Sequence, residues 1–274
     1  MPVAPILRVV LALSLVAACA RAAVLDFEGA VVNGTAGVDG LRLTTALAAS
    51  PDGNNVYVTA EGDDAVTVLA RGPGGPLVYT QTLREGSAGI DGLDGAVAVA
   101  VAPDGGHVYV AGAAADAVAV FARDVTTGVL AFNGRVRDGE GGVDGLAGVR
   151  GLAVSPDGAH VYAAGTDDRS IAIFARDLAT GGLTFAARVV DGQAGVDGIA
   201  GVQGIIVSSD GLNLYAAGTD DDAVAVFTRD PQSGLLTWLE RRKDGTNGVD
   251  GLAGAVALAL SPDGAHLYVA GADE

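Results

Sequence analysis

Four polar side chains interrupt two columns of mostly small or apolar residues, and these columns recur along the chain every 52 or 53 residues. One column reads Arg42, Asp94, Ala147, Ala200 and Ala253, and the other reads Thr45, Val97, Arg150, Gln203 and Val256. A guanidinium group can hold a carboxylate or phosphate through paired hydrogen bonds, and a carboxylate can activate water or orient a hydroxyl. The candidate ligand-binding residues are therefore Arg42, Asp94, Arg150 and Gln203, and Asp94 and Arg150 are also the candidate catalytic residues. The alternative is a set of solvated surface residues in tolerant columns.

The aspartates of a recurring Gly-Val-Asp-Gly turn are candidate metal ligands. They are Asp39, Asp91, Asp144, Asp197 and Asp250. The turn GEGGVDGL resembles the calcium-binding nonapeptide, but that motif binds through tandem copies nine residues apart. Calcium takes six or more oxygen ligands, whereas each turn supplies one carboxylate. We therefore expect these aspartates to stabilise their own turns and expect no cofactor, with calcium binding as the alternative.

One repeated unit of about 53 residues carries all these side chains. The turn aspartates and the glycines of a Ser-Pro-Asp-Gly turn, which include Gly53 and Gly105, share one spacing of 52, 53, 53 and 53 residues. The units start near residues 34, 86, 139, 192 and 245, and the last is incomplete. A fixed period of this length is typical of repeat architectures.

Each complete unit predicts four short strands. In the third unit they are GLAVS, HVYAAG, SIAIFAR and LTFAARVV, which are rich in β-branched and aromatic residues and are separated by turn residues. Repeated four-stranded antiparallel units of about 50 residues are the blades of an all-β propeller. A β-solenoid is the alternative, but four hairpin turns in one 53-residue coil would be unusual. In a propeller, the candidate ligand-binding residues would converge at one mouth of the central channel.

The aromatic and histidine residues also follow the repeat. All thirteen aromatic residues fall in three columns, which indicates core packing between equivalent elements. His107, His160 and His266 share the position after Pro-Asp-Gly, on the face opposite the mouth, so we do not expect a catalytic histidine.

The first 22 residues predict a secretory signal peptide, followed by a propeller domain over residues 23–274. Arg8 precedes an apolar run over residues 9–18, which is too short to span a bilayer, and small residues follow. Two processing routes are open: cleavage after Ala22, or attachment of a lipid at Cys19. The expected location is periplasmic or extracellular.

Net charge limits the choice of partner. At a formal charge of -17, the surface repels nucleic acid and anionic membranes and attracts cations. The only cysteine is Cys19, so the mature chain has no disulfide. The expected partner is a small-molecule ligand or an extracytoplasmic protein.

The sequence SPDGAHVYAAG, followed by IAIFARDLATGGLTF, resembles the blades of the lactonase-type seven-bladed β-propeller family, which includes 6-phosphogluconolactonase-like proteins. The resemblance implies a seven-bladed ring and lactone hydrolysis, but no catalytic residue of the family can be matched to a position here. The predicted strands number nineteen, or about five blades, and we expect this chain to be part of a longer ring. The expected function is a ligand- or partner-binding scaffold. The alternative is a lactone hydrolase in which Arg42 or Arg150 stabilises the oxyanion and Asp94 activates water.

Overall fold

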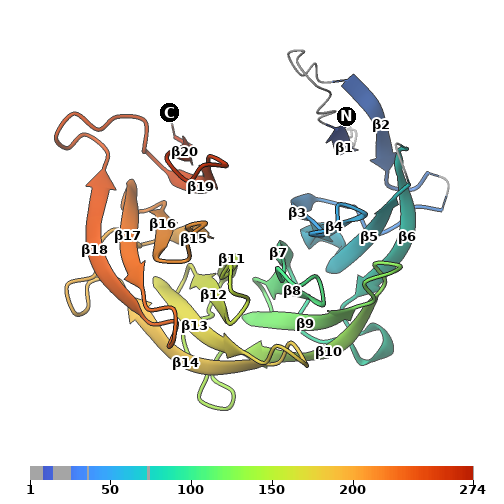
Figure 1. The fold of residues 1–274 in the computed structure, drawn as a ribbon, viewed down its shortest axis with the longest axis horizontal. Helices are drawn as coiled ribbons and strands as arrows, with labels where there is room; N and C mark the ends of the chain where they lie inside the picture. The colour runs from blue at the N-terminus through green and yellow to red at the C-terminus, as the bar shows by residue number, and fades with distance from the viewer. Residues whose placement is uncertain (1–8, 15–25, 36, 73–74, 274) are drawn as a thin grey trace, which may run out of the picture.

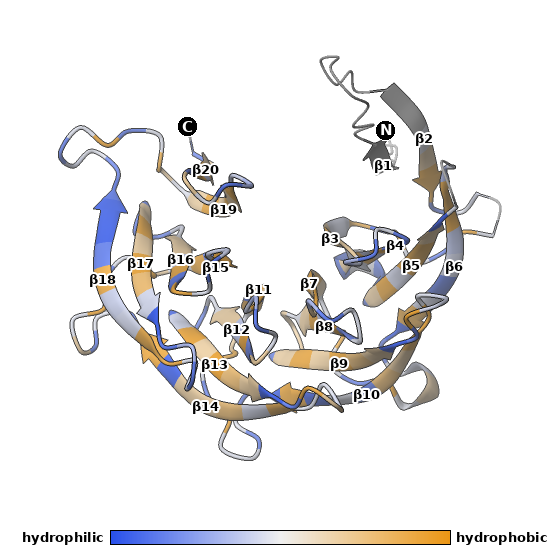
Figure 2. Ribbon diagram, in the orientation of Figure 1, coloured by the Kyte–Doolittle hydropathy of each residue, from blue (hydrophilic) through white to orange (hydrophobic). Residues whose placement is uncertain are grey.

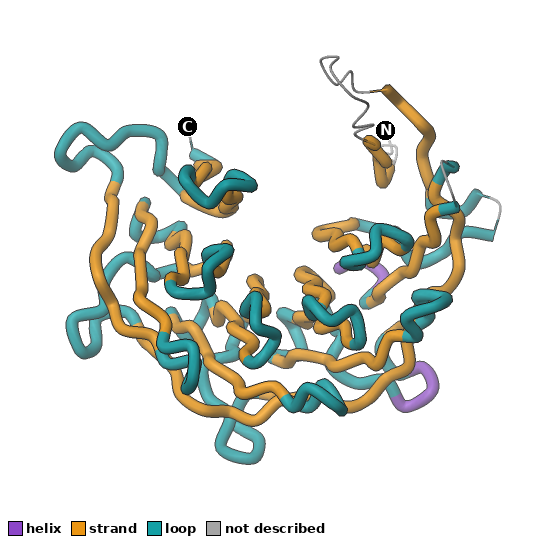
Figure 3. The backbone as a smooth tube through the Cα atoms, in the orientation of Figure 1, coloured by secondary structure: helices purple, strands orange, loops and turns teal. Residues whose placement is uncertain are grey.

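The regular structure consists almost entirely of β-strands. The computed structural model describes residues 9–14, 26–35, 37–72 and 75–273. Within this part of the chain, the only helical segments are two 3-10 turns, η1 (Glu61–Asp63) and η2 (Ser87–Gly89) (Figure 3). No described helix is long and apolar enough to cross a membrane. The predicted all-β fold is confirmed.

Four antiparallel sheets of four strands form complete blades, each with its strands paired in chain order. Blade 1 consists of β3 (Thr44–Ala49), β4 (Asn55–Ala60), β5 (Ala65–Arg71) and β6 (Leu77–Arg84). Blade 2 consists of β7 (Ala96–Val101), β8 (His107–Gly112), β9 (Ala117–Arg123) and β10 (Leu130–Arg137). Blade 3 consists of β11 (Val149–Val154), β12 (His160–Gly165), β13 (Ser170–Arg176) and β14 (Leu183–Val190). Blade 4 consists of β15 (Val202–Val207), β16 (Asn213–Gly218), β17 (Ala223–Arg229) and β18 (Leu236–Lys243).

The blades lie side by side in an arc, with their first strands innermost and their fourth strands outermost (Figure 1). Two further strand pairs flank the arc: β1 (Val9–Ser14) with β2 (Asp26–Val32), and β19 (Ala255–Leu260) with β20 (Leu267–Gly271). Apart from β1, these are the nineteen strands that the repeat predicts. β1 belongs to the predicted signal peptide, whose remaining residues, including Cys19, lie outside the described residues.

The hydrophobic core is divided into layers between neighbouring blades. In one layer, Tyr109 and Val120 of blade 2 pack with Val161 and Phe174 of blade 3. Figure 2 shows that strands such as β9 and β17 are largely hydrophobic, whereas the far end of β18 is hydrophilic. Each blade buries its faces only when a neighbour stands beside it, so the stability of the fold comes from contacts between repeats.

A buried arginine at the end of each third strand in blades 2 to 4 joins that blade to the one before it. In blade 3, Arg176 Nε donates a hydrogen bond of 2.7 Å to the hydroxyl of Tyr109 in blade 2. Its NH2 group contacts Asp104 Oδ2 at 2.7 Å and His107 Nδ1 at 2.8 Å, both in blade 2. Its NH1 group donates to the carbonyl of Gly158 in its own blade. The side chain of Arg176 is 0% exposed, so this charge is fully compensated inside the protein.

The same arrangement recurs on both sides of blade 3. Arg229 binds Tyr162, Asp157 and His160, and Arg123 binds Tyr57, Asp52 and Asn55. His107 and His160 are thus buried hydrogen-bond partners of arginine, and His266 in the flanking pair is exposed. Asn55 holds the equivalent position in blade 1, with Oδ1 2.8 Å from Arg123 NH2.

Glycine is required in the hairpin that covers each histidine. Gly181 has a φ of +74°, and a Cβ there would lie 2.2 Å from Cδ2 of His107. The carbonyl of Gly181 also accepts a 2.9 Å hydrogen bond from the Tyr109 hydroxyl. A larger residue would therefore push blade 3 away from blade 2.

Burial and charge set the protonation states in this contact. Burial, and then the guanidinium of Arg176, lower the pKa of His107. Burial and Arg229 do the same to the pKa of His160. Burial opposes ionisation of Asp157, but hydrogen bonds from Ser155 and Arg229 lower its pKa to about 2. The arginine therefore lies between an ionised aspartate and a neutral histidine.

We expect Arg176→Ala to lower the free energy of unfolding by about 3 kcal/mol, because it leaves buried polar partners in the preceding blade without their donor. Arg242→Ala removes an exposed pair with Glu240 and should cost less than about 1 kcal/mol. Urea unfolding of both variants measures the difference. Equal costs would show that the buried arginine does not hold the blades together.

Stability should also fall in mild acid. Because the pKa of His107 and His160 in the folded state lies below the unfolded value of about 6.5, neutral histidine stabilises the fold fully above that pH. This stabilisation is lost as pH decreases through the folded pKa. In a His107→Asn, His160→Asn double variant, which copies Asn55, the melting temperature should change less between pH 7 and pH 5 than in the wild type. An unchanged pH dependence would contradict the assignment.

Candidate functional site

The turns between a fourth strand and the next first strand lie on the same face as the turns between second and third strands. In each unit, a polar residue at the start of the fourth-to-first turn accepts a hydrogen bond from the backbone eight residues later. The acceptors are Asn33, Glu85, Asp138, Asp191 and Asp244. Aspartates of the second-to-third turns add bonds to the next blade, as in Asp116 to the backbone N–H of Gly148. Much of the acidic surface charge therefore holds backbone N–H groups in place.

The aspartates of the Gly-Val-Asp-Gly turns contact arginines of the fourth strands. The pairs are Asp39 with Arg84, Asp91 with Arg135 and Arg137, Asp144 with Arg188, and Asp197 with Arg241. For Asp91, hydrogen bonding to Arg135 lowers the pKa of the carboxyl group. Asp250 occupies the corresponding exposed position before β19. These ion pairs tie each turn to the outer edge of its own blade.

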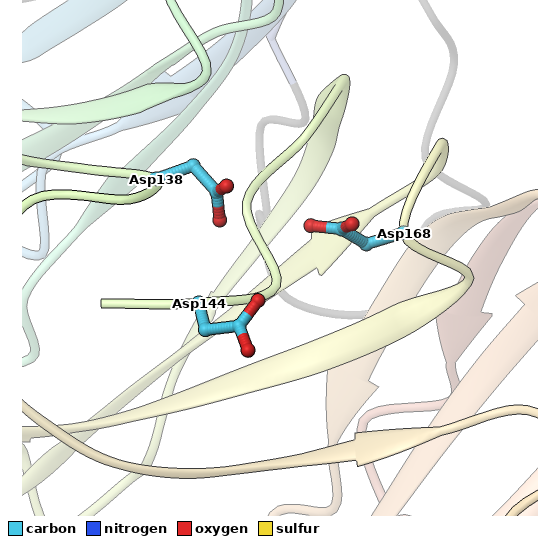
Figure 4. Close-up of side chains that lie close together, drawn as sticks. All are labelled: Asp138, Asp144 and Asp168. Atoms are coloured by element: carbon cyan, nitrogen blue, oxygen red, sulfur yellow. The ribbon is translucent and has the colours of Figure 1, made fainter. Parts of the chain in front are cut away.

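Two of the candidate metal ligands lie in groups of three carboxylates. Asp144 is grouped with Asp138 and Asp168, with ligand atoms within 4.8 Å of one another (Figure 4). Asp197 is grouped in the same way with Asp191 and Asp221. Three carboxylates supply only part of the oxygen shell that calcium takes. In the first group, Asp138 and Asp168 already accept backbone N–H bonds.

The first strands surround a cavity of about 400 Å³ at the inner side of the arc. Its lining comes from β3, η1, β7, β11, β15 and β19, so that every unit contributes. Backbone and small apolar side chains form most of the wall. The polar side chains are Thr45, Glu61, Arg150 and Gln203.

Glycines beside two of these polar residues let the first strands approach closely. A Cβ on Gly151 would lie 2.0 Å from the carbonyl oxygen of Gln203. A Cβ on Gly204 would lie 2.7 Å from the carbonyl oxygen of Val256. The backbones of β11, β15 and β19 are therefore in near contact where Arg150 and Gln203 line the cavity.

The cavity includes two of the four predicted ligand-binding residues. Arg150 and Gln203 line it, but Arg42 and Asp94 do not. The Arg42 side chain is 68% exposed, and its Nε lies 3.3 Å from Asp63 Oδ1. Asp94 is exposed, and its backbone carbonyl accepts N–H bonds from Ala114 and Ala115. The structure thus brings Arg150 and Gln203 together and places Arg42 and Asp94 outside this cavity.

Sequence reasoning did not identify Glu61, which lines the cavity from η1. Its column in the repeat reads Glu61, Ala113, Thr166, Thr219 and Ala272. In blades 3 and 4, the threonine hydroxyl donates to the first strand of the next unit, at 2.7 Å to Val202 O and 2.9 Å to Ala255 O. An ionised carboxylate cannot donate that bond. Glu61 is the only charged residue in this column, and that difference from the other units could have identified it from the sequence.

The cavity combines a fixed positive charge, a carboxylate, an amide and a hydroxyl. Arg150 can bind a carboxylate, a phosphate or a developing oxyanion. Gln203 can donate and accept hydrogen bonds, and Glu61 can accept a proton or orient a hydroxyl. None of the described lining residues is a histidine, cysteine or serine. Glu61 can therefore serve as the base for attack by water, and among these lining residues the threonine hydroxyl of Thr45 has no histidine beside it to activate it.

Comparison with known proteins places the fold. Residues 46–200, more than half of the chain, match the family described as "Lactonase, 7-bladed beta-propeller". Among proteins with curated function, none matches the sequence. The chain is 25% identical to the periplasmic gluconolactonase of Pseudomonas aeruginosa, with a TM-score of 0.59, and the alignment covers 74% of this chain and 55% of that one.

Two further solved structures share the fold at lower identity. A proposed 6-phosphogluconolactonase from Bacteroides uniformis is 20% identical, with a TM-score of 0.61 and coverage of 74% of this chain and 58% of that one. Hydrazine synthase from Kuenenia stuttgartiensis is 21% identical, with a TM-score of 0.58 and coverage of 87% and 58%. The alignments thus span between 55% and 58% of these three proteins. By its match over residues 46–200 and its four-stranded blades, the chain belongs to the lactonase family of seven-bladed β-propellers.

Proposed function

We propose that this protein binds a small hydroxylated lactone in the channel cavity and hydrolyses its ring ester. The observation that carries the proposal is the meeting of Arg150, Gln203 and Glu61 in one cavity of about 400 Å³, at positions where the repeat departs from its own pattern. A volume of this size suits a small ligand. Membership of the lactonase family supports the choice of reaction.

The proposed reaction needs no covalent intermediate with the protein. Glu61 accepts a proton from water as the water oxygen bonds to the lactone carbonyl carbon. Arg150 stabilises the negative charge that develops on the carbonyl oxygen. The bond between this carbon and the ring oxygen then breaks, and the ring oxygen takes the proton from Glu61. The product is a hydroxy acid, and its new carboxyl group faces Arg150 and loses its proton to solvent.

Gln203 would orient the substrate rather than take part in proton transfer. Its amide side chain can pair with a hydroxyl of the ligand through one donor and one acceptor. The small residues around it, including Gly151 and Gly204, leave room for a ring against the strands. This combination favours a polyhydroxylated ligand over a purely apolar one.

A second candidate function is binding without turnover, as a scaffold for a small ligand or an extracytoplasmic protein. The observation that favours it is the composition of the cavity wall, which is mostly backbone and small apolar side chains such as Ala46, Val97 and Ala257. A wall of this kind holds a ligand by shape and offers few groups for catalysis. Both functions place a small-molecule ligand in the same cavity.

We also propose that the protein is exported. The charge and apolar run of residues 1–22 support this location. Expression in a bacterial host with an envelope fraction tests it: mass spectrometry should find a mature N-terminus at Ala23, or a lipid-modified Cys19 if the second route operates. Full-length chain in the cytoplasmic fraction would contradict export.

Turnover should depend on the polar residues of the cavity. We expect the purified chain to hydrolyse a sugar lactone such as gluconolactone above the rate of the buffer alone. Arg150→Val copies Val97 and Val256, and Glu61→Ala copies Ala113, so both variants place residues that the repeat already accommodates. Each should lower kcat/KM at least about a hundredfold, the usual scale for loss of a general base or an oxyanion donor.

Asp94→Ala distinguishes the two assignments of the base. Activity retained in Asp94→Ala and lost in Glu61→Ala supports the cavity, whereas the reverse pattern supports the rim residue predicted from sequence. If the wild type binds the ligand but neither it nor any of the variants hydrolyses it, the scaffold function is the correct one. Circular dichroism and melting temperature confirm that each variant is folded.

A further inference from the structure

A second pocket lies on the outer side of the arc, between blades 2 and 3, and encloses about 550 Å³. One wall carries Arg135 and Arg137 at the end of β10. The turn from Glu140 to Val143 closes one end. β14 contributes Leu183, Thr184 and Phe185 to the lining. The lining thus combines two arginine side chains with apolar side chains.

Two arginines and two carboxylates form a closed network in this pocket. Asp91 Oδ2 lies 2.5 Å from Arg135 Nε, and Asp91 Oδ1 lies 2.5 Å from Arg137 NH2. Glu140 Oε2 lies 2.7 Å from Arg135 NH1, and Oε1 lies 3.3 Å from NH2 of the same guanidinium. Arg137 NH1 lies 3.7 Å from Glu140 Oε1. On Arg135, Asp91 binds the Nε group, and the carboxylate of Glu140 binds the two remaining nitrogens.

The repeat shows that this arrangement is peculiar to blade 2. The two basic positions read Thr82 and Arg84 in blade 1, Arg135 and Arg137 in blade 2, Arg188 and Val190 in blade 3, and Arg241 and Lys243 in blade 4. The position of Glu140 is Thr35, Ser87, Gln193 or Thr246 in the other units. Only blade 2 combines two arginines with a glutamate. Since the fold forms without this combination in the other blades, folding does not require it.

The contact made by Glu140 can open at small cost. The Glu140 side chain is 54% exposed, so water can solvate its carboxylate when the bidentate contact with Arg135 opens, and the pair contributes on the order of 1 kcal/mol. Glu140 lies between Gly139 and Gly141, with φ of +73° and +59°. The position of Gly141 is Ala88 or Ala194 in blades 1 and 3, so this turn has more backbone freedom than its equivalents.

We propose that this inter-blade pocket binds a small carboxylic acid with an apolar group, and that Glu140 is a tethered competitor for the same guanidinium contacts. The ligand carboxylate would replace that of Glu140 on Arg135 and Arg137. Its apolar group would lie against Leu183 and Phe185, which are partly buried at the edge of the core layer. Glu140 would then turn out into water.

The pocket should prefer an acid with an apolar group because the ligand carboxylate only replaces the carboxylate of Glu140. Replacing one carboxylate by another on the same arginines leaves the ion-pair energy nearly unchanged. The apolar surface removed from water is then the main source of affinity. A carboxylate without an apolar group gains little, and an apolar molecule without a carboxylate cannot displace Glu140.

The proposal is tested by titrating octanoate into the purified chain by isothermal titration calorimetry. Glu140→Gln copies Gln193 of the next blade, so it should fold, and it removes the competing charge. We expect octanoate to bind Glu140→Gln about three- to tenfold more tightly than the wild type. Adding Arg137→Val, which copies Val190, removes one of the two guanidinium groups and should weaken the binding of octanoate to the Glu140→Gln protein.

Control variants and control ligands test whether the gain in octanoate affinity comes from this pocket. Gln193→Ala alters the equivalent turn of blade 3 and should leave the affinity for octanoate unchanged. Acetate, which lacks the apolar group, and octanamide, which lacks the charge, should each bind Glu140→Gln at least about tenfold more weakly than octanoate. Equal affinity of wild type and Glu140→Gln would overturn the proposal, as would a lack of binding to folded Glu140→Gln at about 10 mM octanoate.

Discussion

The buried arginine at the end of the third strand is the interaction on which the arrangement of blades depends. Arg123, Arg176 and Arg229 each extend into the preceding blade and bind its tyrosine, its turn aspartate and the residue after its Pro-Asp-Gly turn. A charge in this position is tolerated only while all its donors are satisfied. The contact therefore adds a specific polar tie between neighbouring blades to the hydrophobic layers that also join them.

Regular ties on the opposite face explain why so much acidic sequence is structural. Carboxylates such as Asp138 and Asp116 accept backbone N–H bonds, and the Gly-Val-Asp-Gly aspartates pair with arginines of the outer strands. Because these carboxylates recur in every blade, they bind backbone N–H groups and arginines that also recur in every blade. Chemistry that is specific to one ligand must then come from positions where the repeat changes, such as Glu61, Arg150 and Glu140.

The two proposed binding sites follow from this division. The channel cavity is lined by residues that break the repeat pattern in several different blades, because all first strands lie at the inner side of the arc. The inter-blade pocket is instead lined by several residues that break the repeat pattern in one blade, together with apolar side chains of the next blade. In both places the β-strands of the repeated scaffold hold the arginines, which limits the entropy that these side chains lose when a ligand binds.

The sequence by itself determined the all-β fold, the four-stranded blades, the aromatic core and the structural position of the histidines, because period, turn residues and strand patterns are local signals. It also pointed to Arg150 and Gln203 as breaks in a column. Only the tertiary structure decided that Arg42 and Asp94 lie outside the cavity that those two residues line, and that Glu61 belongs to it. The physical reason is that which side chains share a cavity depends on the close approach of β11, β15 and β19 and on the path of the η1 turn, and both arise from packing between blades.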